Sequence, residues 1–291
     1  LISRDSHAVQ VRREYPKFDQ VVTLYNGGFL GEQKTDWRKK DIDVFFPGTY
    51  MSLRQAEKEI WQMEGGFREI ADRVKDRIVG SNLASVWQEE LRGYLREINF
   101  SVSDGEFETL EHVMGPLDNY QRAYMRVAII ETLLQSGIKV TVVGAGWDQY
   151  EGKGRENLTI LSDRGLDITE VIALMGRAKI VLNNTNILDG LHERIVTAML
   201  ANAVSVTNEY DMMSNFFESG KELVTFPLNE IGKLPQIVAD LLANPDKAER
   251  IAEAGYKAAL RAHTWERRGE QIIKWMQDGK PFTYEAEGES A

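Results

Sequence analysis

The sequence predicts an α/β fold built on a Rossmann-like, doubly wound parallel sheet. Between residues 140 and 226, short apolar runs alternate with amphipathic helical stretches. Strands that alternate with helices are joined by right-handed crossovers and therefore lie parallel in one sheet. The chain has 291 residues, of which 43% are hydrophobic, and this is enough for a sizeable buried core.

The N-terminal half predicts mostly helix. A helical pattern at residues 7–15 and an apolar strand at 21–25 precede a polar linker at 31–40. The apolar run 43–46 predicts a buried strand, closed by Pro47 and Gly48. Extra helices follow at 52–98, with interruptions near residues 65 and 80, and at 118–135.

The C-terminal half carries the alternating pattern. Its β-branched runs predict strands, its 3.6-residue periodicity predicts helices, and only helices follow the last strand. Strands are expected at 140–143, 158–161, 180–183, 204–207 and 223–226, and helices at 168–175, 191–201, 230–243, 245–262 and 265–276.

Composition excludes several classes of function. The 35 Lys and Arg against 45 Asp and Glu give a net charge of −10, which argues against nucleic acid as the main partner. No apolar run is long enough for a membrane span, and residues 1–7 lack the apolar core of a signal peptide. The absence of cysteine excludes disulfides and fits a cytoplasmic location.

The loops that follow strands carry the candidate binding residues, because ligands of open parallel sheets bind beyond the carboxyl ends of the strands. In the first loop, Gly48 permits close approach of the backbone to a ligand, and Arg54 could neutralise a phosphate. A tight turn followed by a solvated arginine explains the same two residues equally well.

The second loop begins with Gly144, Gly146 and Trp147. A strand ending in G-x-G suggests a dinucleotide site, but Gln149 stands where the third glycine is needed and no helix follows. The motif therefore argues against an NAD-dependent oxidoreductase. The two glycines and Trp147 are candidates for bordering a nucleotide or sugar, with packing as the alternative for Trp147.

The third loop is the most informative. Asp189, Gly190, His192, Glu193 and Arg194 lie where the loop after a buried strand becomes a helix. Free amides and the helix dipole favour an anion there, and the arginine adds a cationic donor. Taken singly, Asp189 could be an N-cap, Glu193 a first-turn acid and Arg194 a surface residue.

The late motif H-T-W-E-R-R starts the last helix. Thr264 is expected to be its N-cap, and we expect a packed Trp265 with Arg267 and Arg268 in solvent.

The order of the motifs along the chain is informative in itself. They read D-V-F-F-P-G-T with Arg54, V-T-V-V-G-A-G-W, I-V-L-N-N-T-N, D-G-L-H-E-R-I-V-T-A-M, A-V-S-V-T-N, F-F-E-S-G-K-E-L-V-T-F, I-A-E-A-G-Y and H-T-W-E-R-R. This series resembles the nucleotide-binding half of GT-B glycosyltransferases, in the group-1 branch that includes the CgeB-like spore-maturation proteins. The resemblance spans about residues 36–276.

The resemblance implies a domain organisation. Residues 36–277 would form the Rossmann-like donor domain, the C-terminal half of a GT-B fold. Residues 1–35 would be a remnant of the N-terminal, acceptor-binding domain with a linker, and residues 278–291 a disordered tail. The missing N-terminal half is expected in the parent protein.

The resemblance also implies a hexosyltransferase-type enzyme that moves a sugar from a nucleotide-diphosphate sugar to an unknown acceptor, which could be a glycan, a protein or a small molecule. Arg194 and His192 would be the catalytic residues, and the backbone from Gly190 to Glu193 would help to stabilise the diphosphate without a metal. The nucleotide sugar is the only small molecule expected, with no further cofactor. Substrate-binding residues would be Gly48, Arg54, Gly144, Gly146, Trp147, Asn184, Asp189, Gly190 and Glu193.

Departures from the family pattern limit these expectations. Related enzymes often have a ribose-binding glutamate where Thr197 stands, and a Cys-Gly pair where Ala201 and Asn202 stand; asparagine tolerates the left-handed turn. Asp41 and Asp43 match the D-x-D string of metal-dependent sugar transferases, but they precede a strand, so we expect a solvated strand start.

The four histidines show no metal-ligand spacing, so no metal site is expected. A non-catalytic nucleotide-sugar-binding or scaffold module is the alternative function.

Overall fold

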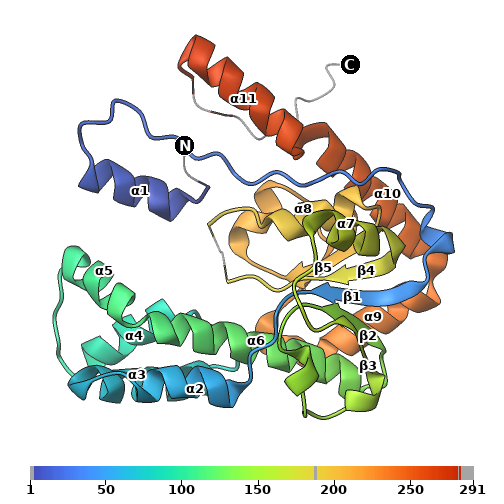
Figure 1. Cartoon of the computed structure of the whole chain (residues 1–291). Coiled ribbons are helices and arrows are strands. Elements are labelled where there is room, and N and C mark those ends of the chain that lie inside the picture. The colour runs from blue at the N-terminus through green and yellow to red at the C-terminus, as the bar shows by residue number, and fades with distance from the viewer. Residues whose placement is uncertain (1–2, 187–188, 281, 283–291) are drawn as a thin grey trace. The chain divides into compact units, whose positions relative to one another are not determined.

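The computed structural model describes residues 3–186, 189–280 and 282, and the chain divides into two compact units (Figure 1). The division does not test the predicted boundaries at residues 35 and 277, which remain predictions. Of the expected tail, only residues 278–280 and 282 are described. Unit 1 comprises Leu1–Pro47, Leu166–Phe226 and Gln236–Ala291, and unit 2 comprises Gly48–Gly165 and Pro227–Pro235.

The strands of unit 1 form a parallel ladder in the order β1-β4-β5-β6. In its register, Ile180 lies opposite both Val44 and Val204. Most ladder residues are buried, as expected of parallel strands covered on both faces. The predicted α/β, Rossmann-like class is confirmed. The strands are β1 (Ile42–Pro47), β4 (Ala178–Leu182), β5 (Val204–Asn208) and β6 (Val224–Phe226).

The helices of unit 1 follow the predicted pattern closely. The short helix α8 connects β4 to β5, and α10 packs against both α8 and β5. Every residue of α8 from 195 to 200 is buried. The helices are α1 (Asp5–Glu14), η1 (Trp37–Lys39), α7 (Ile168–Arg177), α8 (Glu193–Leu200), η4 (Asp211–Asn215), α9 (Leu234–Ala243), α10 (Pro245–Ala262) and α11 (Trp265–Asp278).

The strand expected at 21–25 is not formed. This segment instead runs extended along α8 and α11 as far as Gly28, which makes an isolated parallel bridge to Thr264. A Cβ on Gly28 would lie 2.9 Å from the Thr197 amide nitrogen and 2.8 Å from Val196 Cγ1. Tyr25 is therefore buried against α8 rather than in a sheet, and Gly28 permits the close approach.

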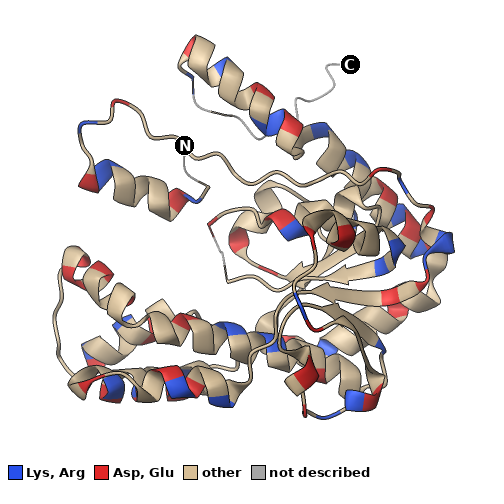
Figure 2. Ribbon diagram, viewed as in Figure 1, with Lys and Arg blue, Asp and Glu red and all other residues tan. Residues whose placement is uncertain are grey.

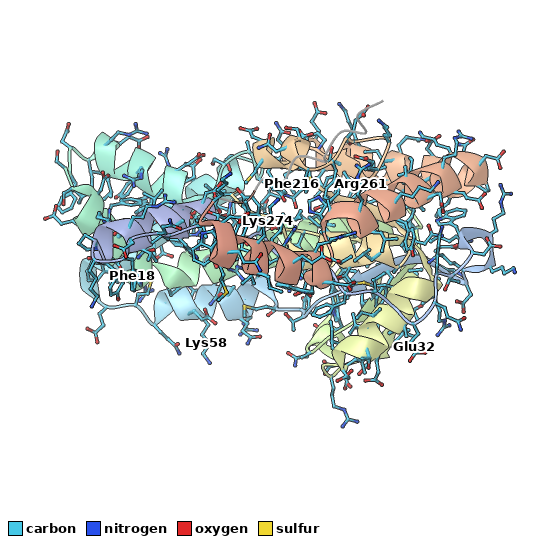
Figure 3. All side chains as sticks on the ribbon, turned by 90° about the horizontal axis from the view of Figure 1, so that it is seen from above. Phe18, Glu32, Lys58, Phe216, Arg261 and Lys274 are labelled. Atoms are coloured by element: carbon cyan, nitrogen blue, oxygen red, sulfur yellow. The ribbon has the colours of Figure 1, made fainter. Side chains whose placement is uncertain are left out.

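Polar contacts attach the same segment to α11. Trp275 Nε1 donates to Gln20 Oε1 over 3.0 Å. Lys274, on the same helix as Trp275, is labelled in Figure 3.

Arg268 is buried, contrary to the expectation that it is solvated; only 1% of it is exposed. Its Nε donates to Tyr25 O over 2.6 Å and its Nη1 to Ala262 O over 2.9 Å. Its Nη2 lies 2.9 Å from His263 Nδ1, and burial, with this guanidinium, lowers the pKa of His263 to about 3. A neutral imidazole can accept this hydrogen bond, which explains how the cation is tolerated. Thr264 is the N-cap of α11, as predicted.

Unit 2 combines a parallel strand pair with a group of helices that has its own apolar core. Helix α5 is missing from the sequence expectation, although Ser103 and Glu106 form the capping box that begins it. The elements are α2 (Leu53–Trp61), α3 (Gly65–Gly80), α4 (Trp87–Glu97), α5 (Asp104–Val113), α6 (Gly115–Gln135), β2 (Val140–Val143), η2 (Trp147–Gln149), η3 (Arg155–Asn157), β3 (Leu158–Ser162) and η5 (Leu228–Lys233).

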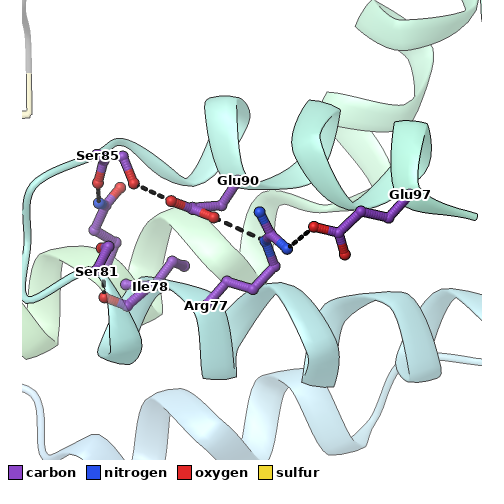
Figure 4. A network of polar contacts seen from close by, with 7 residues as sticks. Arg77, Ile78, Ser81, Ser85, Glu90 and Glu97 are labelled. Carbon is purple, nitrogen blue, oxygen red and sulfur yellow. Dashed lines mark hydrogen bonds and ion pairs between the residues drawn. The ribbon is translucent and has the colours of Figure 1, made fainter.

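A polar network joins α3 to α4 (Figure 4). Arg77 Nε donates to Glu90 Oε2 over 2.8 Å, and Arg77 Nη1 donates to Glu97 Oε1 over 2.7 Å. Gly93 leaves room for this guanidinium, because a Cβ there would lie 3.0 Å from Arg77 Nη2. The network fixes two helices beside a core that packs against α6.

The charged residues of α10 are of mixed sign (Figure 2). Several of them form ion pairs with neighbouring elements, among them Glu249 with Arg38 over 2.8 Å and Lys247 with Asp240 over 2.6 Å. This helix therefore presents no continuous basic surface. Within the described residues, no helix has the length and apolar character needed to cross a membrane.

The close approach at Gly28 generates a prediction. Gly28→Ala should lower the free energy of unfolding by about 1–3 kcal/mol, because the new methyl group meets the backbone of α8. Gly269→Ala is the matched control in α11, since a Cβ there meets nothing within 4 Å, and it should raise stability by about 0.5–1 kcal/mol. Urea unfolding measures both variants. Equal midpoints for the two would contradict the packing argument.

Candidate functional site

The carboxyl ends of β4 and β5 carry a buried polar cluster in unit 1. The Thr185 amide donates to Asn208 Oδ1 over 2.8 Å, and Asn208 Nδ2 donates back to Thr185 O over 3.0 Å. Asn183 Nδ2 donates to Ser205 Oγ over 3.1 Å. The predicted residue Asn184 is buried within this cluster. Asn208 was not predicted, although polar residues at the ends of both strands were a signal for it.

Two atoms of this cluster lack partners. Asn183 Oδ1 and Thr207 Oγ1 are enclosed and have no hydrogen bond among the residues that the structure describes. Burying such groups costs about 1–3 kcal/mol each, so they are uncommon outside functional sites. Asn183 follows the last residue of β4 and Thr207 is the second-last residue of β5, so both lie at the carboxyl end of the sheet, where open α/β sheets bind ligands.

The loop before α8 is held by hydrogen bonds that side chains donate to its carbonyl oxygens. Tyr210 Oη donates to Gly190 O over 3.0 Å, and Asn26 Nδ2 donates to Leu191 O over 3.1 Å. In a trans peptide, the C=O and the following N–H point in opposite directions. The amides of Leu191 and His192 are therefore directed away from Tyr210 and Asn26. Residues 187 and 188 of this loop lie outside the described part of the chain.

His192 is the N-cap of α8, a role that the sequence had suggested for Asp189. Its Nδ1 accepts a hydrogen bond from the Arg194 amide over 3.2 Å. In a neutral ring with this bond, the proton lies on Nε2. The helix begins at Glu193, two residues later than expected, because the capping residue itself is extended.

Arg194 is the cation at this helix start. Its Nη1 is enclosed, and no hydrogen bond to it exists within the described ranges 3–186 and 189–280. Burial lowers the pKa of Arg194 to about 10, against the opposing effect of the Glu193 carboxylate, so the guanidinium is charged at neutral pH. Burial likewise raises the pKa of Glu193. An enclosed cation with an unused donor is suited to an anionic ligand.

Asp189 contacts the protein rather than open space. Its Oδ2 accepts from the Ser6 amide over 2.8 Å, its Oδ1 from Arg4 Nε over 3.0 Å, and its carbonyl oxygen from the Asp5 amide over 3.1 Å. The residue therefore holds the N-terminus of α1. Burial raises the pKa of Asp189, but the hydrogen bonds from Ser6 and the charge of Arg4 outweigh burial and leave this pKa below its usual value.

Thr197 and Asn202, which depart from the family pattern, have local roles in this structure. The Thr197 side chain is buried, and its Oγ1 accepts from the Phe29 amide over 3.2 Å. This threonine therefore bonds the N-terminal segment. Asn202 adopts the left-handed conformation that asparagine tolerates, with φ of 53°.

In unit 2, two loops with predicted site residues interlock. The Gly48 amide donates to Val143 O over 2.9 Å, and the Tyr50 amide donates to Ala145 O over 2.8 Å. Trp147 Nε1 donates to Gly48 O over 2.6 Å. These bonds fix the loop at residues 48–50 against the loop at 144–147.

Both glycines of the second loop are required by this contact. A Cβ on Gly144 would lie 2.5 Å from Gly48 O, and one on Gly146 would lie 2.5 Å from Tyr50 O. Their φ angles of 133° and 90° also favour glycine. Trp147 is fully buried, and its ring centroid lies 5.2 Å from that of Tyr50. These residues shape the loop that could meet a ligand.

Two arginines of unit 2 differ in their surroundings. Arg54 is exposed near the start of α2, as the solvated interpretation expected. Arg126, on α6, was not identified from the sequence, yet its Nη1 donates to Thr49 Oγ1 over 3.1 Å and also to Thr49 O. The sequence carries no signal for this contact, because α6 and the loop are brought together only by folding.

The D-x-D string lies at an exposed strand start, as predicted. Asp41 pairs with Arg177 at 2.5 Å and Asp43 with Lys179 at 2.7 Å. The described residues contain no group of three His, Cys, Asp or Glu arranged to hold a metal ion.

Comparison with known proteins gives one family. The family described as "Glycosyl transferase-like" matches residues 122–274, which is more than half of the chain. None of the curated proteins matches.

Among solved structures, HepE of Anabaena bound to UDP is 17% identical, with a TM-score of 0.43 over 52% of this chain and 44% of its own. The pneumococcal O-GlcNAc transferase GtfA, solved with UDP and GlcNAc, is 8% identical, with a TM-score of 0.49 over 95% of this chain and 44% of its own. The chain thus spans less than half the length of each.

The contacts of Asp189 generate a prediction about α1. Asp189→Ala removes the acceptor for the Ser6 amide and the partner of Arg4, so amides of α1 should exchange about fivefold faster, as a lost cap of about 1 kcal/mol implies. Hydrogen exchange followed by mass spectrometry measures this. Glu14→Ala at the other end of the helix is the control, since that carboxylate accepts from Gln10.

The pH dependence of α1 docking follows from the lowered pKa of Asp189. A carboxylate with a folded-state pKa below its unfolded value contributes stability above pH ~4 and loses it as the pH falls through the folded value. In the wild type, the amides of α1 should therefore remain protected from hydrogen exchange at pH 5. Unchanged exchange in Asp189→Ala would show that other contacts hold the helix.

Proposed function

Because the chain belongs to the glycosyl transferase-like family, we propose that it transfers a sugar from a nucleotide-diphosphate sugar to an acceptor, and that unit 1 binds the diphosphate. The observation that carries this proposal is the enclosed Nη1 of Arg194 at the start of α8, which has no hydrogen-bond partner in the described chain. An unused cationic donor beside helix amides matches the charge of a diphosphate.

The same groups suit the chemistry of transfer. When the bond between sugar and diphosphate breaks, negative charge develops on the departing phosphate oxygen. Arg194 and the amide of Glu193, at the first position of α8, would stabilise that charge without a metal. Because these groups are fixed by the protein before the reaction, little reorganisation is needed.

His192 would contact the sugar or phosphate from the same helix start. Its Nδ1 accepts a hydrogen bond from the Arg194 amide, which places the ring beside the proposed diphosphate site. Protonation of Nδ1 would break the N-cap of the helix that carries Arg194. The cap therefore couples the orientation of this ring to the position of the arginine.

Removal of the guanidinium tests the site. Arg194→Ala should weaken the binding of UDP, GDP or ADP by about 10- to 100-fold in calorimetry, the loss expected for a charge-assisted hydrogen bond. Glu193→Gln should tighten the binding by a few-fold, because it removes a negative charge beside the anion. Arg261→Ala, which changes an exposed arginine of the same unit, is the control. Unchanged affinity in both Arg194→Ala and Glu193→Gln would refute the assignment.

The same variant series makes a prediction about stability. Arg194→Met should raise the free energy of unfolding of the unliganded protein by about 1 kcal/mol, because it removes a partly buried cation whose enclosed Nη1 has no partner in the described chain. Thermal unfolding with and without UDP should show that the ligand stabilises the wild type and not the variant. A variant less stable than the wild type would indicate that Arg194 has a structural role instead.

A further inference from the structure

We infer that Asn183 and Thr207 of unit 1 bind one buried water molecule, which joins the carboxyl ends of β4 and β5 where the loop toward α8 begins. The inference goes beyond the proposed function and does not depend on it. Two enclosed oxygen atoms carry it, Asn183 Oδ1 and Thr207 Oγ1, neither of which has a hydrogen-bond partner among the described residues. The proposed transfer of a sugar gives neither atom a role.

The register of β4 and β5 places both side chains on one face of the sheet. Val181 lies opposite Ser205. Two residues further along, the Asn183 amide continues the ladder by donating to Val206 O over 2.7 Å, so Asn183 lies opposite Thr207. Because side chains alternate along a strand, Asn183 and Thr207 share the face that carries Ser205.

The neighbouring polar side chains on this face are already paired. Asn183 Nδ2 donates to Ser205 Oγ over 3.1 Å, which fixes the plane of the amide and the position of its oxygen. On β6, Thr225 lies opposite Thr207, but its Oγ1 lies 2.8 Å from Ser219 Oγ. A partner for the two enclosed oxygen atoms must therefore lie between β4 and β5.

One water molecule fits this spacing. Neighbouring strands lie about 4.8 Å apart, and an O–H···O hydrogen bond spans about 2.7–2.8 Å, so a single water oxygen can bond to both sides. The water donates a proton to Asn183 Oδ1, which can only accept, and bonds to the Thr207 hydroxyl, which can donate or accept. The Ser205 hydroxyl keeps its own proton and can supply a third bond, the usual number for a buried water.

Burial selects water over larger or charged ligands. Only 2% of Asn183 is exposed, and Ser205 and Thr207 are fully buried, so no nucleotide or sugar reaches these oxygen atoms. A hard cation such as Ca²⁺ takes about six to eight oxygen ligands, usually with carboxylates among them. The side chains that share this part of the face are instead one amide and two hydroxyls.

The water bridge acts at the point where the ladder ends. Asn183 directly follows β4 and is the first residue of the loop that leads to α8. A water-mediated hydrogen bond is enthalpically nearly as good as a direct one. The bridge therefore fixes the first residue of this loop to β5.

Crystallography tests the site directly. A high-resolution crystal structure of the wild type should show one peak of density within hydrogen-bond distance of both Asn183 Oδ1 and Thr207 Oγ1. No peak there would overturn the inference. A strong anomalous peak at the same place after soaking with thallium(I), which substitutes for potassium, would reveal a cation and would overturn it as well.

Thr207→Val tests the same bond in solution, because valine keeps the shape of threonine and removes the hydroxyl. With the water bound, the folding equilibrium constant measured by urea unfolding should fall about fivefold. A dry site gives the opposite sign, because the variant then removes a buried hydroxyl that has no partner. A Thr207→Val variant more stable than the wild type would therefore contradict the inference.

A double-mutant cycle tests whether the two residues share the water. In an Asn183→Ala background the water has lost its other partner, so Thr207→Val should change the folding constant by less than about twofold. Thr225→Val is the matched control, since its hydroxyl pairs with Ser219, and its effect should be equal in both backgrounds. Fully additive losses from Asn183→Ala and Thr207→Val would overturn the bridge. If Asn183→Ala fails to fold, the density and the sign of the Thr207→Val change still decide.

Discussion

The candidate site of unit 1 depends on one interaction, the docking of the extended N-terminal segment against α8 and α11. The buried guanidinium of Arg268 holds this segment by the carbonyl oxygen of Tyr25, and Gly28 allows it to approach α8. Three site contacts follow from the docking. Tyr25 Oη bonds Asp5 in α1 over 2.7 Å, Asn26 orients the Leu191 carbonyl, and the Phe29 amide occupies Thr197. The loop before Arg194 is therefore shaped by residues far from it in the sequence.

Both units orient amide donors by the same physical means. A carbonyl group is fixed by a buried or partly buried donor, Tyr210 in unit 1 and Trp147 in unit 2, and the amide across the trans peptide is turned the other way. Arg194 Nη1, at the start of α8, is an enclosed donor without a partner among the described residues, which costs stability in the unliganded protein. A ligand that supplies the missing acceptor would recover that cost.

Hydrophobic periodicity in the sequence predicted most strands and helices. The predictions failed where contacts between distant parts of the chain decide the structure. The alternation of apolar runs and helical stretches placed β4, α8 and β5, and Asn202, which can tolerate a left-handed turn, adopts one. The run at 21–25 has the composition of a strand, but its neighbours are helices, so it forms no ladder. Arg268 appeared solvated because arginine usually is; the carbonyl groups that surround it come from the other end of the chain.

The sequence by itself determined the α/β class, the positions of the main strands, and the concentration of charged and polar residues where the loop after β4 enters α8. Tertiary structure alone decided what each of those residues contacts. Asp189 accepts a hydrogen bond from Ser6 in α1, and His192 is the N-cap of α8. In unit 2, the contact between Arg126 and Thr49 likewise depends on folding. The physical reason is that periodicity and residue type report local conformation and burial, whereas the direction of a hydrogen bond depends on segments brought together by folding.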